Sequence, residues 1–146
     1  MTTQTAWAHG CDVIGEKTAP TTLNVTDFGT SASAPPPGGP HFLRLVVPAP
    51  SSIDDKPIQI TQIFLRYRTS GGASIINIRL FDCESNLDTL NVSLSHTTFI
   101  TAILAPTLGA PLPVTIGAVA FSIEVVFPPS GGRVDIAGAG FEFTLT

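Results

Sequence analysis

The stretch Ala118-Val119-Ala120-Phe121-Ser122-Ile123-Glu124-Val125-Val126-Phe127 decides the fold class of this chain. Its large apolar residues recur at every second position, as Val119, Phe121, Ile123, Val125 and Phe127. The positions between them hold mostly small or polar residues, with Glu124 as the single charge. Because successive side chains of a β-strand point to opposite faces, a period of two predicts a strand with one buried face.

The same alternation extends over most of the chain. It predicts further strands at 41–47, 57–69, 73–82, 97–104 and 133–145. Thirteen prolines and thirteen glycines punctuate these runs, and no run has the period of an amphipathic helix. We therefore expect an all-β fold, a single-domain antiparallel β-sandwich or jelly roll of about 7–9 strands that spans residues 1–146.

Two local patterns refine this expectation. In the 57–69 run, Ile58 and Ile60 have the opposite parity to Ile63, which predicts a β-bulge or a crossing between sheets near Thr61. The sequence Ser70-Gly71-Gly72 is typical of a tight turn, so the 57–69 and 73–82 strands are predicted to pair as a hairpin.

The chain carries little charge. Only 12% of its 146 residues are Asp, Glu, Lys or Arg, against roughly 25% in an average globular domain. The outward positions of the 118–127 strand are also nearly uncharged. Burial of such faces in a homo-oligomer explains this deficit, and a central place in the sheet under a covering loop is the alternative. The first interpretation is a non-enzymatic, self-associating protein with a binding or structural role.

Charge and hydropathy limit the other partners. The net charge of −4 disfavours binding to nucleic acid or to an anionic membrane surface. No run approaches the roughly 20 apolar residues of a membrane span. The first ten residues lack the pattern of a signal peptide, which predicts a cytoplasmic protein. In that compartment Cys11 and Cys83 are expected to be free, buried thiols, although a bridge between them is the alternative.

The second hypothesis is a lectin-like module that binds a carbohydrate or a small anion. If the predicted hairpin forms, its outer face gathers Arg66, Arg68, Asn77 and Arg79. Arginine side chains can grip a carboxylate, a phosphate or a sugar through forked hydrogen bonds. The same residues can equally form salt bridges between strands or subunits.

Three more residues join this candidate site. Trp7 and His9 stand two positions apart, so one strand face presents both, and His41 meets His9 if their strands pair. Ordinary polar positions near strand ends are the alternative for both histidines. For Trp7, the only tryptophan, a core or interface anchor is the competing interpretation.

The sequence patterns for a metal site or a catalytic site are weaker than those for the carbohydrate or anion site. Oxygen donors alternate at Asp82, Glu84, Asn86 and Asp88, a spacing that can wrap a calcium ion. However, Leu87 stands where an EF-hand loop needs glycine, so a solvated turn is the favoured account and no cofactor is predicted. An enzyme is the third and least favoured hypothesis. The sequence contains no Gly-x-Ser-x-Gly elbow, and no paired carboxylates stand out on one strand.

Short motifs carry a resemblance. Ala6-Trp7-Ala8-His9-Gly10, followed by His41-Phe42 and Val47-Pro48-Ala49-Pro50, resembles a family of small, uncharacterised bacterial all-β proteins with an N-terminal Ala-Trp-x-His-Gly motif. The resemblance implies a bacterial origin and no known activity, so it assigns no catalytic residue.

Overall fold

The computed structural model describes residues 3–15 and 21–146, which form two antiparallel β-sheets packed face to face. Sheet A consists of β1 (Thr3–His9), β3 (Thr22–Thr26), β4 (Gly29–Ser33), β6 (Ser52–Ile53), β7 (Lys56–Ser70), β10 (Ile100–Leu104), β11 (Leu112–Val114) and β13 (Arg133–Leu145). Sheet B consists of β2 (Ile14–Gly15), β5 (Gly39–Pro48), β8 (Ser74–Asp82), β9 (Ser85–Leu94) and β12 (Ala118–Phe127). A single turn of 3₁₀-helix, η1 (Gly10–Asp12), leads from β1 toward sheet B.

This arrangement confirms the predicted fold class, an antiparallel β-sandwich of the jelly-roll type. The described residues contain thirteen strands rather than seven to nine, because several, such as β2 and β6, are only two residues long. None of the described segments is a helix long and apolar enough to span a bilayer.

The core lies between the two sheets and follows the alternation of the sequence. The five inward residues of β12, from Val119 to Phe127, are all almost completely buried. They face the inward side chains of sheet A, among them Ile63, Leu65 and Phe141. Burial of large apolar side chains, each contributing about 1.5–3 kcal/mol, is the main stabilising term for such a sandwich.

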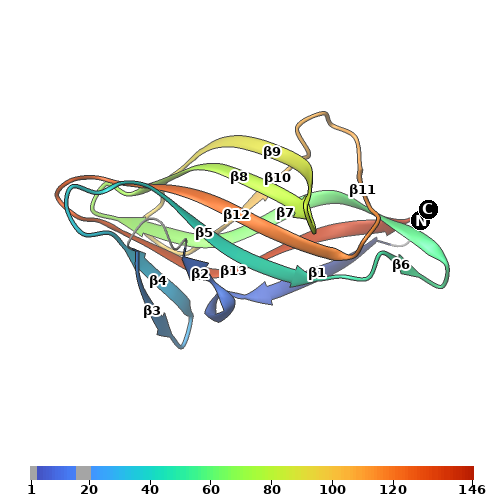
Figure 1. Ribbon diagram of the computed structural model, residues 1–146, viewed down its shortest axis with the longest axis horizontal. Coiled ribbons are helices and arrows are strands. Elements are labelled where there is room, and N and C mark those ends of the chain that lie inside the picture. The colour runs from blue at the N-terminus through green and yellow to red at the C-terminus, as the bar shows by residue number, and fades with distance from the viewer. Residues whose placement is uncertain (1–2, 16–20) are drawn as a thin grey trace.

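Strand β12 occupies the centre of sheet B. It pairs with β5 along one edge and with β8 along the other, and Figure 1 shows the three side by side as one layer. Neighbouring side chains therefore cover the weakly charged outer face of β12: Ser122 is buried, and Ala120 and Glu124 are half-buried. The nearly uncharged outward positions of the 118–127 strand had two explanations, a subunit contact or a central position in the sheet. The topology agrees with the central position.

The predicted hairpin of 57–69 with 73–82 is wrong. The Ser70-Gly71-Gly72 turn exists, but it leads from β7 in sheet A to β8 in sheet B. Strand β7 already has β13 on one edge and β10 and β11 on the other, so neither edge is open to β8. Consequently β8 pairs with β9 and β12 instead.

The predicted irregularity near Thr61 is confirmed as a β-bulge. The register between β7 and β13 passes from Gln62↔Glu142 to Ile60↔Phe143, which leaves Thr61 without an opposite residue. This extra residue lets both Ile60 and Ile63 point into the core although they differ in parity.

Asp82, at the end of β8, ties sheet B to the segment before β12. Its fully buried carboxylate accepts hydrogen bonds from the backbone N–H groups of Thr115, Ile116 and Gly117 at 2.7–2.9 Å. The Thr115 hydroxyl donates a fourth bond at 3.0 Å. Burial opposes ionisation of Asp82, but these four donors outweigh it and lower the pKa of the carboxyl from 3.8 to about 2.

The Asp82 carboxylate should make the fold sensitive to acid. Because its pKa is lower in the folded chain, its contribution to stability is fully present above about pH 4 and disappears as the pH falls towards 2. We expect Asp82→Asn to lower the free energy of unfolding at neutral pH by about 2 kcal/mol and to flatten its decline between pH 4 and 2. Urea unfolding at a series of pH values measures both effects. Asp55→Asn, which removes the same charge from an exposed turn, serves as the control, and an equally flat curve for that control contradicts the assignment to Asp82.

Candidate functional site

The outer face of sheet A carries an aromatic pair. Trp7 of β1 and Phe64 of β7 flank Gly140 of β13 from its two sides. Their ring centroids are 5.4 Å apart and the ring planes differ by only 8°. Ile103 of β10 lies opposite Phe64 and is 64% exposed, so it extends the line of apolar groups across the sheet. We call Trp7, Phe64 and Ile103 the aromatic row.

Two glycines of β13 give the Trp7 ring its position. A Cβ atom at Gly140 would lie 2.3 Å from the backbone oxygen of Ala6 and 2.8 Å from Cδ2 of Trp7. A Cβ atom at Gly138 would lie 2.9 Å from the backbone oxygen of Ala8 and 3.6 Å from Cε3 of Trp7. The indole therefore lies over the bare backbone of β13, with 47% of the Trp7 surface still exposed.

Polar side chains border the aromatic row on both sides. On one side Thr5, Gln62 and Glu142 stand opposite one another on β1, β7 and β13, and we call them the acidic row. On the other side His9 of β1, Arg66 of β7 and Thr101 of β10 form the basic row, with Gly138 between His9 and Arg66.

Hydrogen bonds position one charged group in each polar row. The Thr61 hydroxyl donates to Oε1 of Glu142 at 2.8 Å. Nη1 of Arg66 donates to the Thr101 hydroxyl at 3.2 Å, and the guanidinium lies 5.8 Å from the centroid of the Phe99 ring. An apolar strip with hydrogen-bonding groups along both edges is the result.

A shallow cavity of about 280 Å³ lies where the aromatic row meets the basic row. Its lining consists of Trp7, Ala8, His9, Arg66, Ala137 and Gly138. Because Gly138 has no side chain, the space between His9 and Arg66 above β13 stays open. A ligand resting on Trp7 can therefore reach both polar side chains.

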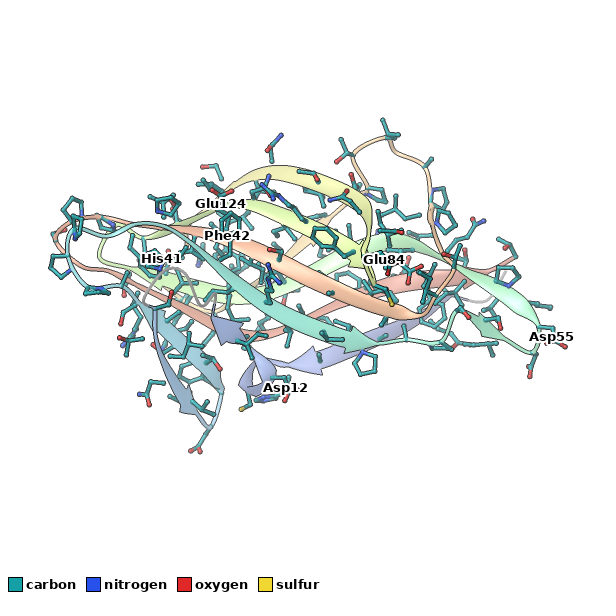
Figure 2. All side chains as sticks on the ribbon, viewed as in Figure 1. Asp12, His41, Phe42, Asp55, Glu84 and Glu124 are labelled. Atoms are coloured by element: carbon teal, nitrogen blue, oxygen red, sulfur yellow. The ribbon has the colours of Figure 1, made fainter. Side chains whose placement is uncertain are left out.

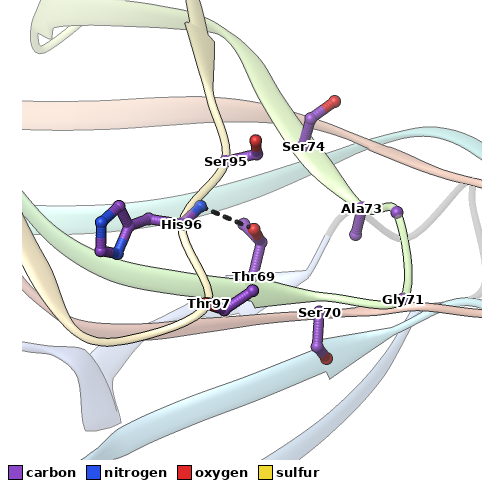
Figure 3. Close-up of a pocket in the computed structure, with 9 residues that line it drawn as sticks. Thr69, Ser70, Gly71, Ala73, Ser74, Ser95, His96 and Thr97 are labelled. Atoms are coloured by element: carbon purple, nitrogen blue, oxygen red, sulfur yellow. Dashed lines mark hydrogen bonds between the residues drawn. The ribbon is translucent and has the colours of Figure 1, made fainter.

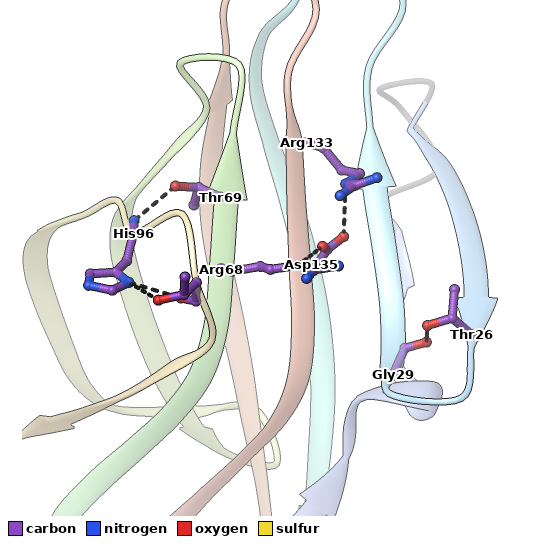
Figure 4. A network of polar contacts seen from close by, with 8 residues as sticks. Thr26, Gly29, Arg68, Thr69, His96, Arg133 and Asp135 are labelled. Carbon is purple, nitrogen blue, oxygen red and sulfur yellow. Dashed lines mark hydrogen bonds and ion pairs between the residues drawn. The ribbon is translucent and has the colours of Figure 1, made fainter.

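Arg68 lies on the same face but belongs to an ion-pair network (Figure 4). Its Nε donates to Oδ2 of Asp135 at 2.5 Å, and Nε of Arg133 lies 3.2 Å from Oδ1 of the same carboxylate. The Arg68 guanidinium also packs on Phe28 and Phe99, at 5.2 and 4.5 Å from the ring centroids. These contacts give Arg68 a structural role in joining β7 to β13, so its donors are largely committed.

Asn77 and Arg79 lie on the opposite face of the sandwich. They belong to β8, so the prediction that they share a face with Arg66 and Arg68 is wrong for the same reason as the hairpin. Asn77 donates to the side chain of Asn91 at 2.9 Å, and the Arg79 guanidinium lies 5.5 Å from the Phe42 ring centroid. Figure 2 shows Phe42 near Glu124, its cross-strand partner, over this outer face of sheet B.

The two candidate histidines do not meet. His9 belongs to β1, and its Nδ1 accepts a hydrogen bond from the backbone N–H of Cys11. His41 belongs to β5 in sheet B, where it is buried with its edge against the Phe127 ring, and its Nδ1 lies 2.7 Å from the Thr21 hydroxyl. The strands of the two histidines do not pair, since β1 pairs with β13 and β5 with β12 and β2, and His9 is exposed whereas His41 is buried.

The alternating oxygen donors at 82–88 do not wrap a common point. Only Cys83 and Glu84 form a turn, and Asn86 and Asp88 already belong to β9, a strand that the sequence patterns did not predict. The Asp88 carboxylate accepts from the backbone N–H groups of Thr89 and Thr107. Across residues 3–15 and 21–146, no three His, Cys, Asp or Glu side chains cluster as a metal site.

Both cysteines are free in the structure. Cys11 is half-buried, with its Sγ 3.6 Å from the backbone oxygen of Thr26, and Cys83 is exposed in the β8–β9 turn. The expectation of two buried thiols is therefore wrong for Cys83, because that residue lies in a turn at the end of sheet B.

A larger cavity of about 410 Å³ lies beside the turn between β7 and β8 (Figure 3). Its lining is mostly backbone and small side chains, with His96 as the one ring. The backbone N–H of His96 donates to the Thr69 hydroxyl at 3.0 Å, which ties the segment before β10 to β7. Without a flat aromatic surface or a charged arginine, this cavity offers less for recognition than the face around Trp7.

Solved structures share this fold. No family model and no curated protein sequence matches the chain. The carbohydrate-binding module TmCBM61, in complex with β-1,4-galactotriose, superposes with a TM-score of 0.54 at 12% identity, over 92% of this chain and 87% of the module. The CBM36-1 domain of a multidomain xylanase from the hindgut metagenome of Trinervitermes trinervoides gives 0.50 at 8% identity, over 96% of both chains. At these identities the likeness shows the fold alone.

A third similar structure is part of an enzyme. A family two carbohydrate esterase from Cellvibrio japonicus gives a TM-score of 0.55 at 14% identity. The match covers 99% of this chain but only 35% of the esterase, so the chain corresponds to about a third of that protein.

Sequence patterns placed Trp7, His9 and Arg66 among the candidates but missed their closest partners. Phe64 has the same parity as Arg66 and therefore lies on the outer face of its strand, yet its contact with Trp7 depends on the register of β1, β13 and β7. The interpretation of Trp7 as a core residue is wrong, because its ring lies outside sheet A. The available signal was Gly138-Ala139-Gly140, since glycines inside a strand mark a close approach of another group.

The glycine at 140 should be essential for the position of Trp7. We expect Gly140→Ala to lower the free energy of unfolding by about 1–3 kcal/mol, because the added Cβ meets the fixed backbone oxygen of Ala6. It should also shift the fluorescence of Trp7, the only tryptophan. Gly15→Ala is the matched control, since its nearest neighbour would be a flexible leucine side chain at 3.5 Å. Equal stability and fluorescence in the two variants would contradict this role.

Proposed function

We propose that this chain binds carbohydrate on the outer face of sheet A. The observation that carries the proposal is the half-exposed Trp7 ring over bare glycine backbone, beside the parallel ring of Phe64. A site of this kind needs an apolar surface for orientation and a few polar groups for specificity. The aromatic row supplies the first, and the acidic and basic rows supply the second.

The chemistry of a sugar suits this arrangement. A pyranose ring has faces lined by C–H groups, which pack on an aromatic ring, while its hydroxyl groups project around the ring edge. With the sugar on Trp7, those hydroxyl groups point toward Gln62 and Glu142 on one side and toward His9 and Arg66 on the other. Glu142 accepts hydrogen bonds and Arg66 donates them, so both roles of a hydroxyl group are served.

The aromatic surface is already in its binding position. Trp7 contacts the backbone of β13 below and Phe64 beside it, so its side chain has little freedom left to lose. Side chains that are held in place before binding cost less entropy when the ligand arrives. A shallow site on a sheet can therefore bind without a loop that closes over the sugar.

The similar structures support the same class of ligand. One was solved with β-1,4-galactotriose bound, and another is a carbohydrate-binding domain of a xylanase. The proposal for this chain rests on its own outer face, because the fold alone does not assign a ligand.

Removal of the Trp7 ring should weaken binding strongly. We expect Trp7→Ala to weaken the affinity for a bound oligosaccharide by about thirtyfold or more, because buried aromatic anchors contribute about 2 kcal/mol or more. A glycan array identifies the oligosaccharides that bind, and isothermal titration calorimetry measures their affinities. Because Trp7 is the only tryptophan, the fluorescence of the unmodified chain reports binding at this face directly.

Phe42→Ala is the matched control for that experiment. Phe42 is an aromatic residue on the outer face of sheet B, so its removal should leave the affinity unchanged. Circular dichroism confirms that both variants are folded. Loss of binding in Phe42→Ala but not in Trp7→Ala places the site on the opposite sheet and refutes the proposal.

Self-association is the second candidate function. Large apolar side chains are exposed at several places on the surface, namely Trp7, Ile14, Val25, Val46, Ile100, Ile103, Leu108 and Ile116. Ile14 and Val46 line one shallow cavity beside the edge strand β2, which favours a contact between copies at that edge. The others lie on strands of sheet A or in loops, whereas Ile14 and Val46 belong to sheet B.

The mass in solution tests this second function. If copies associate through the edge at β2, light scattering after size exclusion should give a multiple of 15.2 kDa, and Ile14→Ser should return the mass to that of one chain. A mass of 15.2 kDa at high protein concentration rules out self-association.

A further inference from the structure

We infer that the saccharide bound at this face is acidic, and that its carboxylate lies in the cavity between Trp7, His9 and Arg66. This inference rests on the proposed function, since it names the class of sugar that the same face selects. It follows from the charges around the cavity, which differ on the two sides of the aromatic row.

Most hydrogen-bond donors of the Arg66 side chain remain available to a ligand. Its exposed guanidinium carries five N–H donors, and the structure shows one hydrogen bond for it, from Nη1 to the Thr101 hydroxyl. In the described part of the chain, the ion pairs of arginine are those of Arg68 and Arg133, both with Asp135. Arg66 is therefore a cation without a carboxylate partner there, and it borders an open cavity.

His9 adds a second donor. Its Nδ1 accepts the backbone N–H of Cys11 at 3.2 Å, so in the neutral ring the proton resides on Nε2. The Nε2–H group therefore remains available as a donor. Arg66 and His9 stand on either side of Gly138, and together they present donors to the same space.

The carboxylates of this face do not neutralise the cavity. Its lining contains no Asp or Glu. Asp135 is 1% exposed, and both Arg68 and Arg133 pair with its carboxylate. These three side chains together carry one net positive charge. Glu142 lies beyond Trp7, in the acidic row, where it accepts from Thr61. The side of the face around Arg66 thus keeps an excess of positive charge.

The spacing fits one acidic sugar residue. Positions two residues apart along β13, such as Gly140 and Gly138, are separated by about 7 Å. That length matches a pyranose ring stacked on Trp7 with the carboxylate on its C5 atom extending towards Gly138. A planar carboxylate can accept two parallel hydrogen bonds from an arginine, which the hydroxymethyl group of a neutral sugar cannot do.

The experiment compares acidic oligosaccharides with their uncharged esters. Oligogalacturonate, oligomannuronate and hyaluronan oligosaccharides, each as the free acid and as the methyl ester, are titrated into the full chain by calorimetry and by Trp7 fluorescence. We expect at least one acid to bind at least tenfold more tightly than its ester, and this preference should shrink as salt is added. A sulfated galacto-oligosaccharide in the same series separates a carboxylate from a sulfate.

Two arginine variants carry the test. We expect Arg66→Gln to lower the affinity for the acid at least tenfold and the affinity for the ester much less, so that the preference for the acid disappears. Arg66 is exposed and makes a single side-chain hydrogen bond, so the variant should remain folded, which circular dichroism verifies. Arg79→Gln removes the same charge from the opposite sheet and should change neither affinity.

The outcomes separate the two proposals. If neutral sugars or esters bind as tightly as the acids and Arg66→Gln has no effect, the acidic ligand is refuted while carbohydrate binding stands. If only the sulfated probe binds, the carboxylate is refuted. If no saccharide binds at all, the proposed function fails and this inference fails with it.

Discussion

Backbone hydrogen bonding along both edges of β13 is the constraint on which the rest of the structure depends. One edge pairs with β7 over its whole length, and the other pairs with β4 and then with β1. These registers decide which outward residues become neighbours, and they bring Trp7 and Phe64 together across Gly140. The same strand also sends Phe141 into the core, so one sequence segment organises both faces of the sheet.

Several of the few charged residues of this chain serve the fold itself. Asp82 and Asp135 are buried and bound by several donors, so they act as internal ties rather than as surface charges. Arg68 and Arg79 lie on aromatic rings and cover the sheets with their long side chains. Among the few charges on the outer face of sheet A, Arg66 and Glu142 border the Trp7 ring, one on each side.

Much of the fold could be predicted because alternation is a local property. The buried face of β12 and the bulge at Thr61 follow directly from the parity of apolar residues, and both agree with the structure. The supposed hairpin failed because a tight turn does not reveal whether the chain stays in its sheet or crosses to the other one. Whether β8 can pair with β7 depends on the two edges of β7, and these edges pair with β13 and with β10 and β11.

The sequence by itself determined the class of the fold, the strands with the strongest alternation and the outward direction of Arg66 and Phe64. It did so because a period of two reports which side of a strand is buried. Only the tertiary structure decided that Trp7 lies over the glycines of β13, that Arg79 belongs to the far face and that His41 is buried away from His9. Those relations join residues more than a hundred positions apart or in different sheets, and local periodicity contains no information about such pairing.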